Sequence, residues 1–576
     1  MDNSAACLFD GPRLVAAVEN ERLSRIKNDG AFPTRAIAAC LETAGITLAE
    51  VDRVAVYWQP WRVGTRAWGT LRKMMGSRVA RRAVAARARA MFSRAAGDHD
   101  DAAQGRWADL FRVRRRIEEA LGEGLCAEIR FYDHHLAHQL YAEAMRDWDE
   151  LASLSYDGGG EAASTVVSVV RSGERRTLSV HRWPNSLGHF YSTFTGYLGF
   201  QMLEGEYKMM GLAPYGSPRF ASALEEEILR LEPEGRYRLN TRLCDYHAAL
   251  VGRFHPRLEA LFGPPRKPNE PPSEAHVDLA ASVQHVFERA QAHVLSPLAH
   301  VAPDLRRLVI SGGCALNVTA NGRLLEKGLF DEIIIPPAPH DAGCAIGAAM
   351  ADLRARGVGV DHASVRTPYL GPRYEDRRIA EAVRREVGCD LTPMGEQDLV
   401  DATAAILAGG LVVAWYQGRS EFGPRALGAR SFLADPRRDE IREELNRKIK
   451  KRELFRPFAP SVVEEAAGEF FELAQPSPYM NIVARVRPEA RSRIPAVTHV
   501  DGTARVHTVS AAANPRYHAL LRRFGELTGV PVLLNTSFNI QEPIVETPEE
   551  ALATFRASGV DALVIGPYVV RREQLA

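Results

Sequence analysis

Apolar and polar positions alternate along the chain in patterns that predict strands leading into helices. The opening segment SAACLFDGPRLVAAVENERLSRI predicts two strands joined by the turn Asp10–Pro12, because an Asp-Gly pair between apolar runs is a hairpin signal. FPTRAIAACLETAGI predicts a helix that ends near Gly45, and VDRVAVYW predicts another strand. From Leu151 onward, strands and helices alternate as they do in an α/β domain.

Three glycine-containing turns each follow a predicted strand in this region. They are Asp157–Gly160, Ser311–Gly313 and Asp341–Gly347. Glycines at strand–helix junctions let phosphate or sugar oxygens approach backbone N–H groups at the positive end of the helix. One such turn occurs in any α/β fold, whereas three in succession indicate a nucleotide-binding fold.

Two histidines are spaced by four residues in FYDHHLAHQLYAEAM, directly after the strand-like run AEIRFYD. A helix at this position places His134 and His138 on one face, with His135 rotated away. Two imidazoles at that spacing hold a metal ion when a carboxylate arrives from elsewhere. An isolated pair is more often the polar start of a helix, but Asp157 at the end of a nearby strand favours a metal site.

The second half of the chain concentrates basic residues beside glycine and proline turns. Guanidinium forks suit bidentate contact with phosphate, and lysine supplies a point charge. Surface ion pairs are the alternative interpretation. The apolar neighbours Phe455, Pro457 and Phe458 indicate burial, which favours a phosphate-rich pocket. Its basic candidate residues are Arg419, Arg425, Arg430, Lys450, Lys451, Arg452, Arg456 and Arg505. The polar candidates Asn535, Ser537 and Asn539 follow a later predicted strand.

Length and composition limit the class of protein. A chain of 576 residues exceeds what one core usually supports, so at least two domains are expected. The aperiodic segment Asp361–Asp376 is the predicted boundary. A hydrophobic content of 46% and a charged content of 25% are typical of a globular protein. The net charge of +1 gives no reason to expect a general nucleic-acid or membrane binder.

Cysteine usage and the N-terminus bear on the compartment. The seven cysteines are scattered and free of CxxC spacing, which argues against a disulfide framework and favours a reducing cytoplasm. The N-terminus lacks the apolar region of a signal peptide, and no stretch reaches the length of an apolar membrane span. The basic stretch Arg62–Arg94 is interpreted as a solvated helix pair rather than an anion site.

Collinear segments over nearly the whole chain resemble the NodU-type O-carbamoyltransferases, a family that includes the cephem and tobramycin carbamoyltransferases. These segments include HHLAHQLYA, LSYDGGGE, GEYKMMGLAPYG, SGGCALN and PHDAGCAIGAA in the first half. GPRALGARS, FRPFAP and NTSFN in the second half are the most specific.

The resemblance implies two α/β domains and a two-step reaction. Residues 1–365 resemble an actin-like, sugar-kinase-like ATPase fold, and residues 366–576 resemble the YrdC fold. In the family, carbamoyl phosphate and Mg-ATP form carbamoyl adenylate in the second domain. The carbamoyl group then passes to a hydroxyl of a small acceptor, such as a natural product or sugar, in the metal-containing first domain.

The resemblance also carries roles onto residues of this chain. The matches to the catalytic and substrate-binding residues of the second domain are Lys450, Arg456, Arg505 and Ser537, with Arg419, Arg425, Arg430 and Asn535. The matches to the metal ligands are His134, His138, Asp157 and Asp341, which suit iron, with zinc or manganese as alternatives. The matches to the nucleotide contacts of the first domain are Gly158, Gly159, Glu206, Lys208, Gly312, Gly313 and Asn317.

The sequence departs from the family at its start. Family members carry a strand and a histidine-aspartate turn before the segment that begins here at Ser4. We therefore expect the first strand of the first domain to be missing from this sequence and the natural polypeptide to begin upstream. The alternatives are a threonylcarbamoyl-adenosine synthase acting on tRNA, a sugar or acid kinase, and a non-catalytic nucleotide-binding regulator. Salt-sensitive tRNA binding would favour the first. The acceptor stays open, as does the oligomeric state, with a homodimer as one option.

Overall fold

The computed structural model describes residues 3–62, 64 and 107–575 and divides the chain into two compact units. The N-terminal unit comprises residues 1–13, 28–34 and 46–362, and the C-terminal unit comprises residues 14–27, 35–45 and 363–576. Their junction at His362 and Ala363 lies inside the aperiodic segment. Most of the basic stretch that begins at Arg62 lies outside the described residues.

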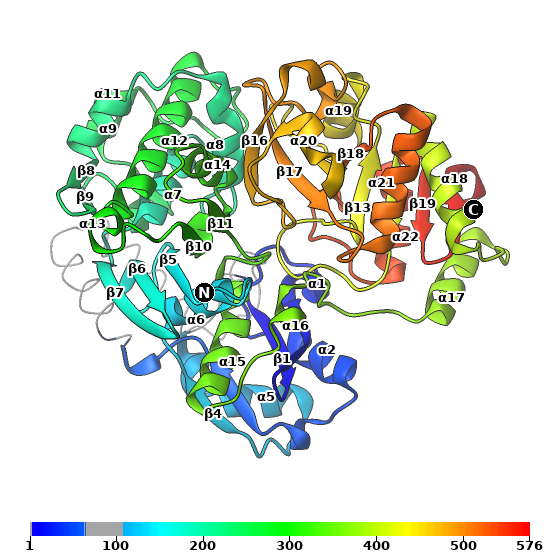
Figure 1. Cartoon of the computed structure of the whole chain (residues 1–576), viewed down its shortest axis with the longest axis horizontal. Coiled ribbons are helices and arrows are strands. Elements are labelled where there is room, and N and C mark those ends of the chain that lie inside the picture. The colour runs from blue at the N-terminus through cyan, green and yellow to red at the C-terminus, as the bar shows by residue number, and fades with distance from the viewer. Residues whose placement is uncertain (1–2, 63, 65–106, 576) are drawn as a thin grey trace. The chain divides into compact units, whose positions relative to one another are not determined.

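A five-stranded sheet forms the centre of the N-terminal unit, in the order β11-β10-β5-β6-β7. β10 pairs in parallel with β5 and β11, whereas β5, β6 and β7 pair antiparallel. Figure 1 shows α7 and α12 above this sheet and α6 and α15 below it. The strands are β5 (Glu150–Tyr156), β6 (Ala163–Arg171), β7 (Glu174–Arg182), β10 (Arg307–Ser311) and β11 (Glu332–Ile334).

Burial along these strands follows their positions in the sheet. β5 and β6 are buried at nearly every residue, as expected for inner strands with both faces covered. β7 is an edge strand and is exposed along most of its length. The main helices are α6 (His134–Glu143), α7 (Leu187–Tyr197), α8 (Glu206–Leu212), α12 (Glu274–Val294), α14 (Val318–Glu326) and α15 (Cys344–Ala355).

Helices α6 and α15 pack unusually close together. A Cβ atom at Gly347 of α15 would collide with the carbonyl oxygen of Ala137 in α6. Glycine is therefore required here for helix packing. A parallel pair, β3 (Arg53–Val56) and β4 (Glu128–Phe131), leads into α6.

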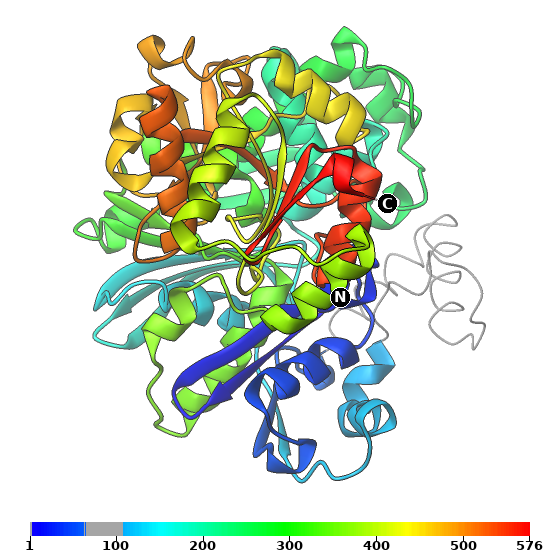
Figure 2. The ribbon, with the colours of Figure 1, turned by 90° about the vertical axis from the view of Figure 1, so that its right-hand side faces the viewer.

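The smaller elements agree with the predicted pattern. The predicted hairpin is present as β1 (Ala5–Asp10) and β2 (Arg13–Glu19), an extended ribbon in Figure 2. The predicted helix is α2 (Thr34–Ala44). The remaining elements of the N-terminal unit are α5 (Val113–Leu121), α9 (Ala221–Glu227), β8 (Leu229–Glu232), β9 (Arg236–Leu239), α10 (Tyr246–Ala249), α11 (Pro256–Phe262) and α13 (Leu298–Val301).

The C-terminal unit is built on a nine-stranded mixed sheet, in the order β15-β16-β17-β14-β18-β13-β12-β19-β20. The inner strands β12, β13, β14 and β19 are buried at every residue, and helices pack against this core. The strands are β12 (Val413–Tyr416), β13 (Arg430–Ala434), β14 (Ala459–Val463), β15 (Phe471–Glu472), β16 (Ile482–Val486), β17 (Thr503–Val509), β18 (Val532–Ser537), β19 (Ala562–Ile565) and β20 (Tyr568–Arg571).

Helices of this unit pack in pairs, α18 with α21 and α17 with α22. Figure 2 shows α22 beside the last strands of the chain. The helices are α1 (Asn20–Ser24), α16 (His362–Arg366), α17 (Asp376–Val387), α18 (Glu396–Ala408), α19 (Glu440–Glu444), α20 (Ala467–Phe470), α21 (Pro515–Thr528) and α22 (Pro548–Ser558). No helix in the described ranges is long and apolar enough to cross a membrane. The seven cysteines, all of which lie in the described ranges, form no disulfide bond.

Candidate functional site

The two spaced histidines face each other at the start of α6. Asp133 caps this helix, its carboxylate accepting a hydrogen bond from the Leu136 backbone N–H at 3.0 Å. His134 and His138 are both buried, and their Nε2 atoms are 3.2 Å apart. His135 turns away as predicted, and its Nδ1 lies 2.8 Å from the Ser155 hydroxyl. The helical spacing therefore produces the predicted pair.

Two carboxylates complete this group, which we call the histidine–carboxylate cluster (His134, His138, Asp157 and Asp341). The Oδ2 atom of Asp157 lies 3.1 Å from His138 Nε2 and 3.5 Å from His134 Nε2. The Oδ1 of Asp341 lies 3.7 Å from each of the same nitrogens. One donor atom from each of the four residues lies within 4.8 Å of the others. Two nitrogens and two oxygens converging in a buried place fit a divalent metal ion.

The charges of this cluster are balanced within it. Burial raises the pKa of Asp157, but hydrogen bonds from His134 and His138 outweigh it and hold that pKa well below its usual value. Burial lowers the pKa of His138, yet Cys344, Asp157 and Asp341 together hold it well above the ordinary value. Burial, followed by the charges of His134 and His138, lowers the pKa of His135 to about 4, and the opposing effect of Asp133 is smaller.

Two of the predicted glycine turns lie beside this cluster. A Cβ atom at Gly313 would be 3.1 Å from Asp157 Oδ1, and a Cβ atom at Gly160 would be 2.9 Å from His134 Cδ2. Gly312 has a φ of +92° and no room for a side chain beside the Tyr156 carbonyl. The backbone N–H of Gly158 donates to Asp157 Oδ1. These turns hold the metal-ligand candidates in place, as well as being candidates for nucleotide binding.

The residues predicted to contact a nucleotide in the N-terminal unit differ in the hydrogen bonds that they make within the protein. Glu206, the first residue of α8, accepts hydrogen bonds from the Ser192 hydroxyl at 2.6 Å and from Leu203 N–H at 2.9 Å. Lys208 is partly buried on the same helix. Asn317 is buried, caps α14 and exchanges two 3.0 Å hydrogen bonds with Gln284. The nucleotide role of Gly159, Glu206, Lys208 and Asn317 stays a prediction.

In the C-terminal unit, the strand register places polar residues on one face of the sheet. Ala459 pairs with Asn535, and Ser461 of the same strand pairs with His507. Residues that pair directly share a face, and so do residues two apart in a strand. Arg505, two residues before His507, therefore lies on the same face as Asn535. The Nδ2 of Asn535 donates to the Ser461 hydroxyl at 3.0 Å, which agrees with this placement.

Positive charge gathers at this face in what we call the arginine cluster (Arg425, Arg452, Arg456 and Arg505). Burial lowers the pKa of Arg425 to about 10. Burial and the three other arginines of the cluster lower the pKa of Arg505 well below its usual value. Within the described part of the chain, the buried Nε of each of these two side chains has no hydrogen-bond partner, and neither has Asn535 Oδ1. Unpaired buried donors and positive charge fit an anionic ligand.

Lys450 lies beside this cluster and is held by polar atoms of the strand end after β18. It follows a π-helical turn, Leu445–Ile449, a rare element that often occurs at functional sites. Its Nζ donates to the Asn539 carbonyl and Oδ1 at 2.8 Å each and lies 3.2 Å from the Ser537 hydroxyl. Burial, followed by Arg452 and Arg456, lowers its pKa well below 10.5.

Two predicted phosphate-binding arginines instead hold the backbone. Arg430 is fully buried, donates to the carbonyls of Gln417, Ala429 and Gly418, and stacks on Tyr416 with its guanidinium carbon 3.7 Å from the ring centre. Arg419 donates to backbone carbonyls too, including that of Gly371 at 2.8 Å. Their direct contact with phosphate stays a prediction, and it would require these hydrogen bonds to be exchanged.

Two residues near the histidine–carboxylate cluster were not picked out from the sequence. Glu161 accepts hydrogen bonds from Gln59 N–H at 2.9 Å and His134 N–H at 3.3 Å, and so ties the glycine turn to the start of α6. The sequence signal that could have identified Glu161 is its place at the end of the glycine-rich run DGGGE. Cys344 follows Asp341 at helical spacing and lies against the histidine pair.

Comparison with known proteins identifies the family. The model described as Carbamoyltransferase N-terminus matches residues 1–350, and the model described as Carbamoyltransferase C-terminus matches residues 404–572. The nodulation protein NolNO of Sinorhizobium fredii is 38% identical over 576 residues, covering 99% of this chain and 79% of the relative. The nodulation protein NolO of Bradyrhizobium diazoefficiens is 40% identical over 444 residues, covering 76% and 79%.

The chain belongs to the carbamoyltransferase family, and it is a transferase with a carbamoyl donor and an acceptor as substrates. An uncharacterized protein of Synechocystis is 40% identical over 610 residues, covering 99% of this chain and 95% of the relative. Among solved structures, full-length HypF in the phosphate- and nucleotide-bound form shows 14% identity and a TM-score of 0.25, covering 43% of this chain and 50% of that chain.

Proposed function

We propose that the protein is an ATP-dependent O-carbamoyltransferase that makes carbamoyl adenylate in its C-terminal unit. The observation that carries this proposal is the arginine cluster, whose Arg425 and Arg505 lack acidic partners in the described ranges, beside the unpaired Oδ1 of Asn535. Carbamoyl phosphate and ATP bring several negative charges together. Preorganised cations are the main contribution that a protein makes to such a step.

The residues of this face suit the parts of the two substrates. Arg456 and Arg505 provide guanidinium donors for the phosphate of carbamoyl phosphate, and Arg425 provides one for the ATP phosphates. The Oδ1 of Asn535 can accept a hydrogen bond from the carbamoyl NH₂ group. Lys450 adds a positive charge that Ser537 and Asn539 hold in position.

The atoms of the first step balance in the following way. Carbamoyl phosphate gives up its phosphoryl group to water, and an oxygen of the resulting carbamate attacks the α-phosphorus of ATP. One phosphate and one pyrophosphate leave for each carbamoyl adenylate formed. Lys450, Arg456 and Arg505 neutralise the charge that collects around the phosphorus atoms, and Asn535 orients the carbamoyl group.

The second step is proposed for the N-terminal unit, where the acceptor hydroxyl receives the carbamoyl group and AMP leaves. His134, His138, Asp157 and Asp341 would hold a divalent metal, with iron as our first choice and zinc or manganese as alternatives. When bound, that metal supplies Lewis acidity toward phosphate or carbonyl oxygens. The turns at Gly158–Gly160 and Gly312–Gly313 offer backbone N–H groups to the adenylate. Under this proposal, the N-terminal unit is related to actin-like folds and the C-terminal unit to the YrdC fold.

A direct assay tests the first step. The full chain is incubated with Mg-ATP in the presence and absence of carbamoyl phosphate, and pyrophosphate, phosphate and carbamoyl adenylate are measured, the last by mass spectrometry. We expect pyrophosphate and carbamoyl adenylate only in the complete mixture. If the only activity is formation of ADP without carbamoyl phosphate, the proposal is wrong and the protein is a kinase.

A further inference from the structure

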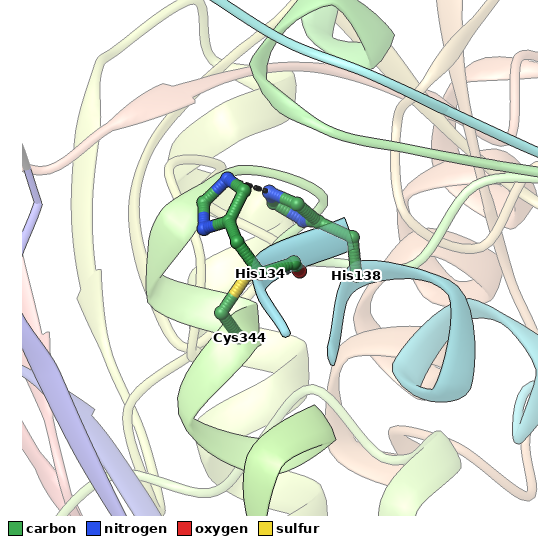
Figure 3. A group of neighbouring side chains, drawn as sticks. All are labelled: His134, His138 and Cys344. Carbon is green, nitrogen blue, oxygen red and sulfur yellow. Dashed lines mark hydrogen bonds between the residues drawn. The ribbon is translucent and has the colours of Figure 1, made fainter. Parts of the chain in front are cut away.

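The Cys344 thiol lies beside the same two histidines that face Asp157 and Asp341. His134, His138 and Cys344 each offer one donor atom, and these three atoms lie within 4.8 Å of one another. Figure 3 shows the imidazole rings of His134 and His138 facing each other and the side chain of Cys344 close to His134. Two donor sets therefore share the histidine pair, one completed by two carboxylates and the other by a sulfur atom.

The local fold holds the sulfur atom in this place. Asp341 and Cys344 are three residues apart where α15 begins, so both side chains lie over the same part of the first turn. One turn further on, the contact of Gly347 with Ala137 keeps the two helix backbones together. Cys344 is 0% exposed and forms a buried cluster with Ala137 and Ala348.

The hydrogen bonding of the thiol is weak enough to be replaced. Its Sγ lies 3.9 Å from the His134 carbonyl oxygen, a long contact for a poor donor. Donors around a tetrahedral zinc ion lie roughly 3.5 Å apart, given metal–ligand distances of about 2.0–2.3 Å. A side-chain movement on the order of 1 Å would therefore bring the sulfur and the two imidazoles around one ion.

We propose that this centre binds a thiophilic divalent metal such as zinc with Cys344 as a ligand beside His134 and His138. The inference rests on the proposed function in that the same histidine pair holds the metal. Sulfur ligands favour zinc, whereas carboxylates suit manganese, so the centre has different donors for different metals. On binding, the S–H bond breaks, a metal–sulfur bond forms and the proton leaves to solvent; no electron is transferred. A buried cysteine that is merely a small apolar residue would form no such bond.

X-ray absorption at the zinc edge tests this directly. The metal-free full chain is loaded with one equivalent of Zn²⁺, in a background in which the exposed Cys126 and Cys389 are replaced by serine to remove adventitious thiols. We expect a sulfur shell at about 2.3 Å beside a nitrogen or oxygen shell at about 2.0–2.1 Å. Zinc bound by nitrogen and oxygen alone would overturn the role of Cys344 and leave the proposed function standing. Failure to bind zinc at all would also overturn the role of Cys344, whereas the proposed function fails only if no carbamoyl adenylate forms from Mg-ATP and carbamoyl phosphate.

Competition between metals gives a second readout that does not depend on the spectrum. Cys344→Ser should lower zinc affinity by at least about tenfold, since loss of even an outer partner of a metal site costs about 10–100-fold. The same variant should leave Mn²⁺ affinity unchanged, and Cys344→Ala should behave likewise if serine perturbs folding. Equal losses for both metals would assign Cys344 to helix packing and contradict the proposal.

Discussion

The two charged clusters of this protein balance their charges in opposite ways. In the histidine–carboxylate cluster, each imidazole faces a carboxylate oxygen, and the four side chains compensate one another. In the arginine cluster, the charges acting on Arg505 all come from other arginines, and its buried Nε has no hydrogen-bond partner in the described part of the chain. The first arrangement is ready for a cation that displaces protons. The second, under our proposal, is completed by an anionic substrate.

This contrast explains why one protein would keep the two sites in separate units. Phosphate oxygens are attracted to uncompensated guanidinium groups, whereas a divalent metal binds electron-pair donors such as imidazole nitrogen, carboxylate oxygen and thiolate sulfur. Merging the two sets would pair the arginines with the aspartates and remove the positive charge that phosphate binding requires. The division into units keeps each set of residues available for its own ligand.

The largest effect is expected from removing one histidine. His138→Ala deletes a buried metal-ligand candidate, so we expect loss of bound metal and of carbamoyl transfer, with pyrophosphate release unchanged. Elemental analysis and separate assays of the two half-reactions measure this. His135→Gln is the matched control on the same helix and should keep its metal, because His135 faces Ser155. Loss of pyrophosphate release in a folded His138→Ala protein would contradict the separation of the two sites.

Two arginines of the C-terminal unit should respond to substitution with opposite signs. Arg505→Met removes an uncompensated charge, so the ligand-free protein should melt at a higher temperature while losing about 2–5 kcal/mol of phosphate binding, as expected for a buried charged hydrogen bond. Arg456→Ala should weaken binding by a similar amount. Calorimetric titration with phosphate and thermal unfolding measure both quantities.

Arg430→Met provides the comparison. Its guanidinium is bonded to three carbonyls and lies 3.9 Å from the fully buried Glu546, so its loss should cost about 3–5 kcal/mol of folding stability. If Arg505→Met destabilises the ligand-free protein as strongly as Arg430→Met does, Arg505 is a structural residue and the arginine cluster is not waiting for an anion.

A smaller effect is expected where the two helices of the metal cluster touch. Gly347→Ala would place a methyl group against the Ala137 carbonyl and should cost about 1–3 kcal/mol, with weaker metal binding because Asp341 lies in the turn Asp341–Gly343 that leads directly into α15. Gly359→Ala, which has open space around it, should be neutral. Chemical denaturation and metal titration measure the pair. Equal stability of the two variants would show that the close packing is unimportant.

The smallest expected effect is a dependence on pH. The pKa of Lys450 is held well below 10.5 by burial and by Arg452 and Arg456. The unfolded chain therefore binds more protons than the folded chain between that lowered pKa and 10.5, so the free energy of unfolding should rise with pH over this window. Phosphate binding needs the ammonium and should weaken over the same window. Lys450→Arg, which stays charged, should remove both slopes; slopes that persist in the variant would assign them to another group.

The metal-ligand candidates could be found from the sequence because their pattern is local. A helix fixes where His134 and His138 point, and the strand end fixes Asp157. Asp341 lies far along the chain from the other three residues, and it reaches them because α6 and α15 pack closely. Only the family resemblance allowed this contact to be predicted from the sequence. Glu161 was not predicted because no characteristic sequence spacing marks a carboxylate that accepts hydrogen bonds from backbone N–H groups.

The arginine-rich half shows the limit of a residue-type argument. Arg419, Arg425, Arg430, Arg456 and Arg505 look alike in sequence, standing beside glycines and apolar residues. Folding separates them by their other nitrogens. Arg419 and Arg430 donate to backbone carbonyls, although the buried Nε of Arg430 is itself unpaired, whereas Arg425 and Arg505 have an unpaired buried Nε and no such carbonyl bonds in the described ranges. Arg430 in β13 and Arg505 in β17 lie on strands and the other three lie in connecting segments, and the sequence pattern does not specify how these parts of the chain come together.

The contrast between the clusters is tested most directly by one measurement. Pyrophosphate release from Mg-ATP is followed with and without carbamoyl phosphate in the wild type, His138→Ala and Arg505→Met. We predict release that depends on carbamoyl phosphate in the first two proteins and none in the third. Release that survives in Arg505→Met, or that is lost in a well-folded His138→Ala protein, would contradict the account.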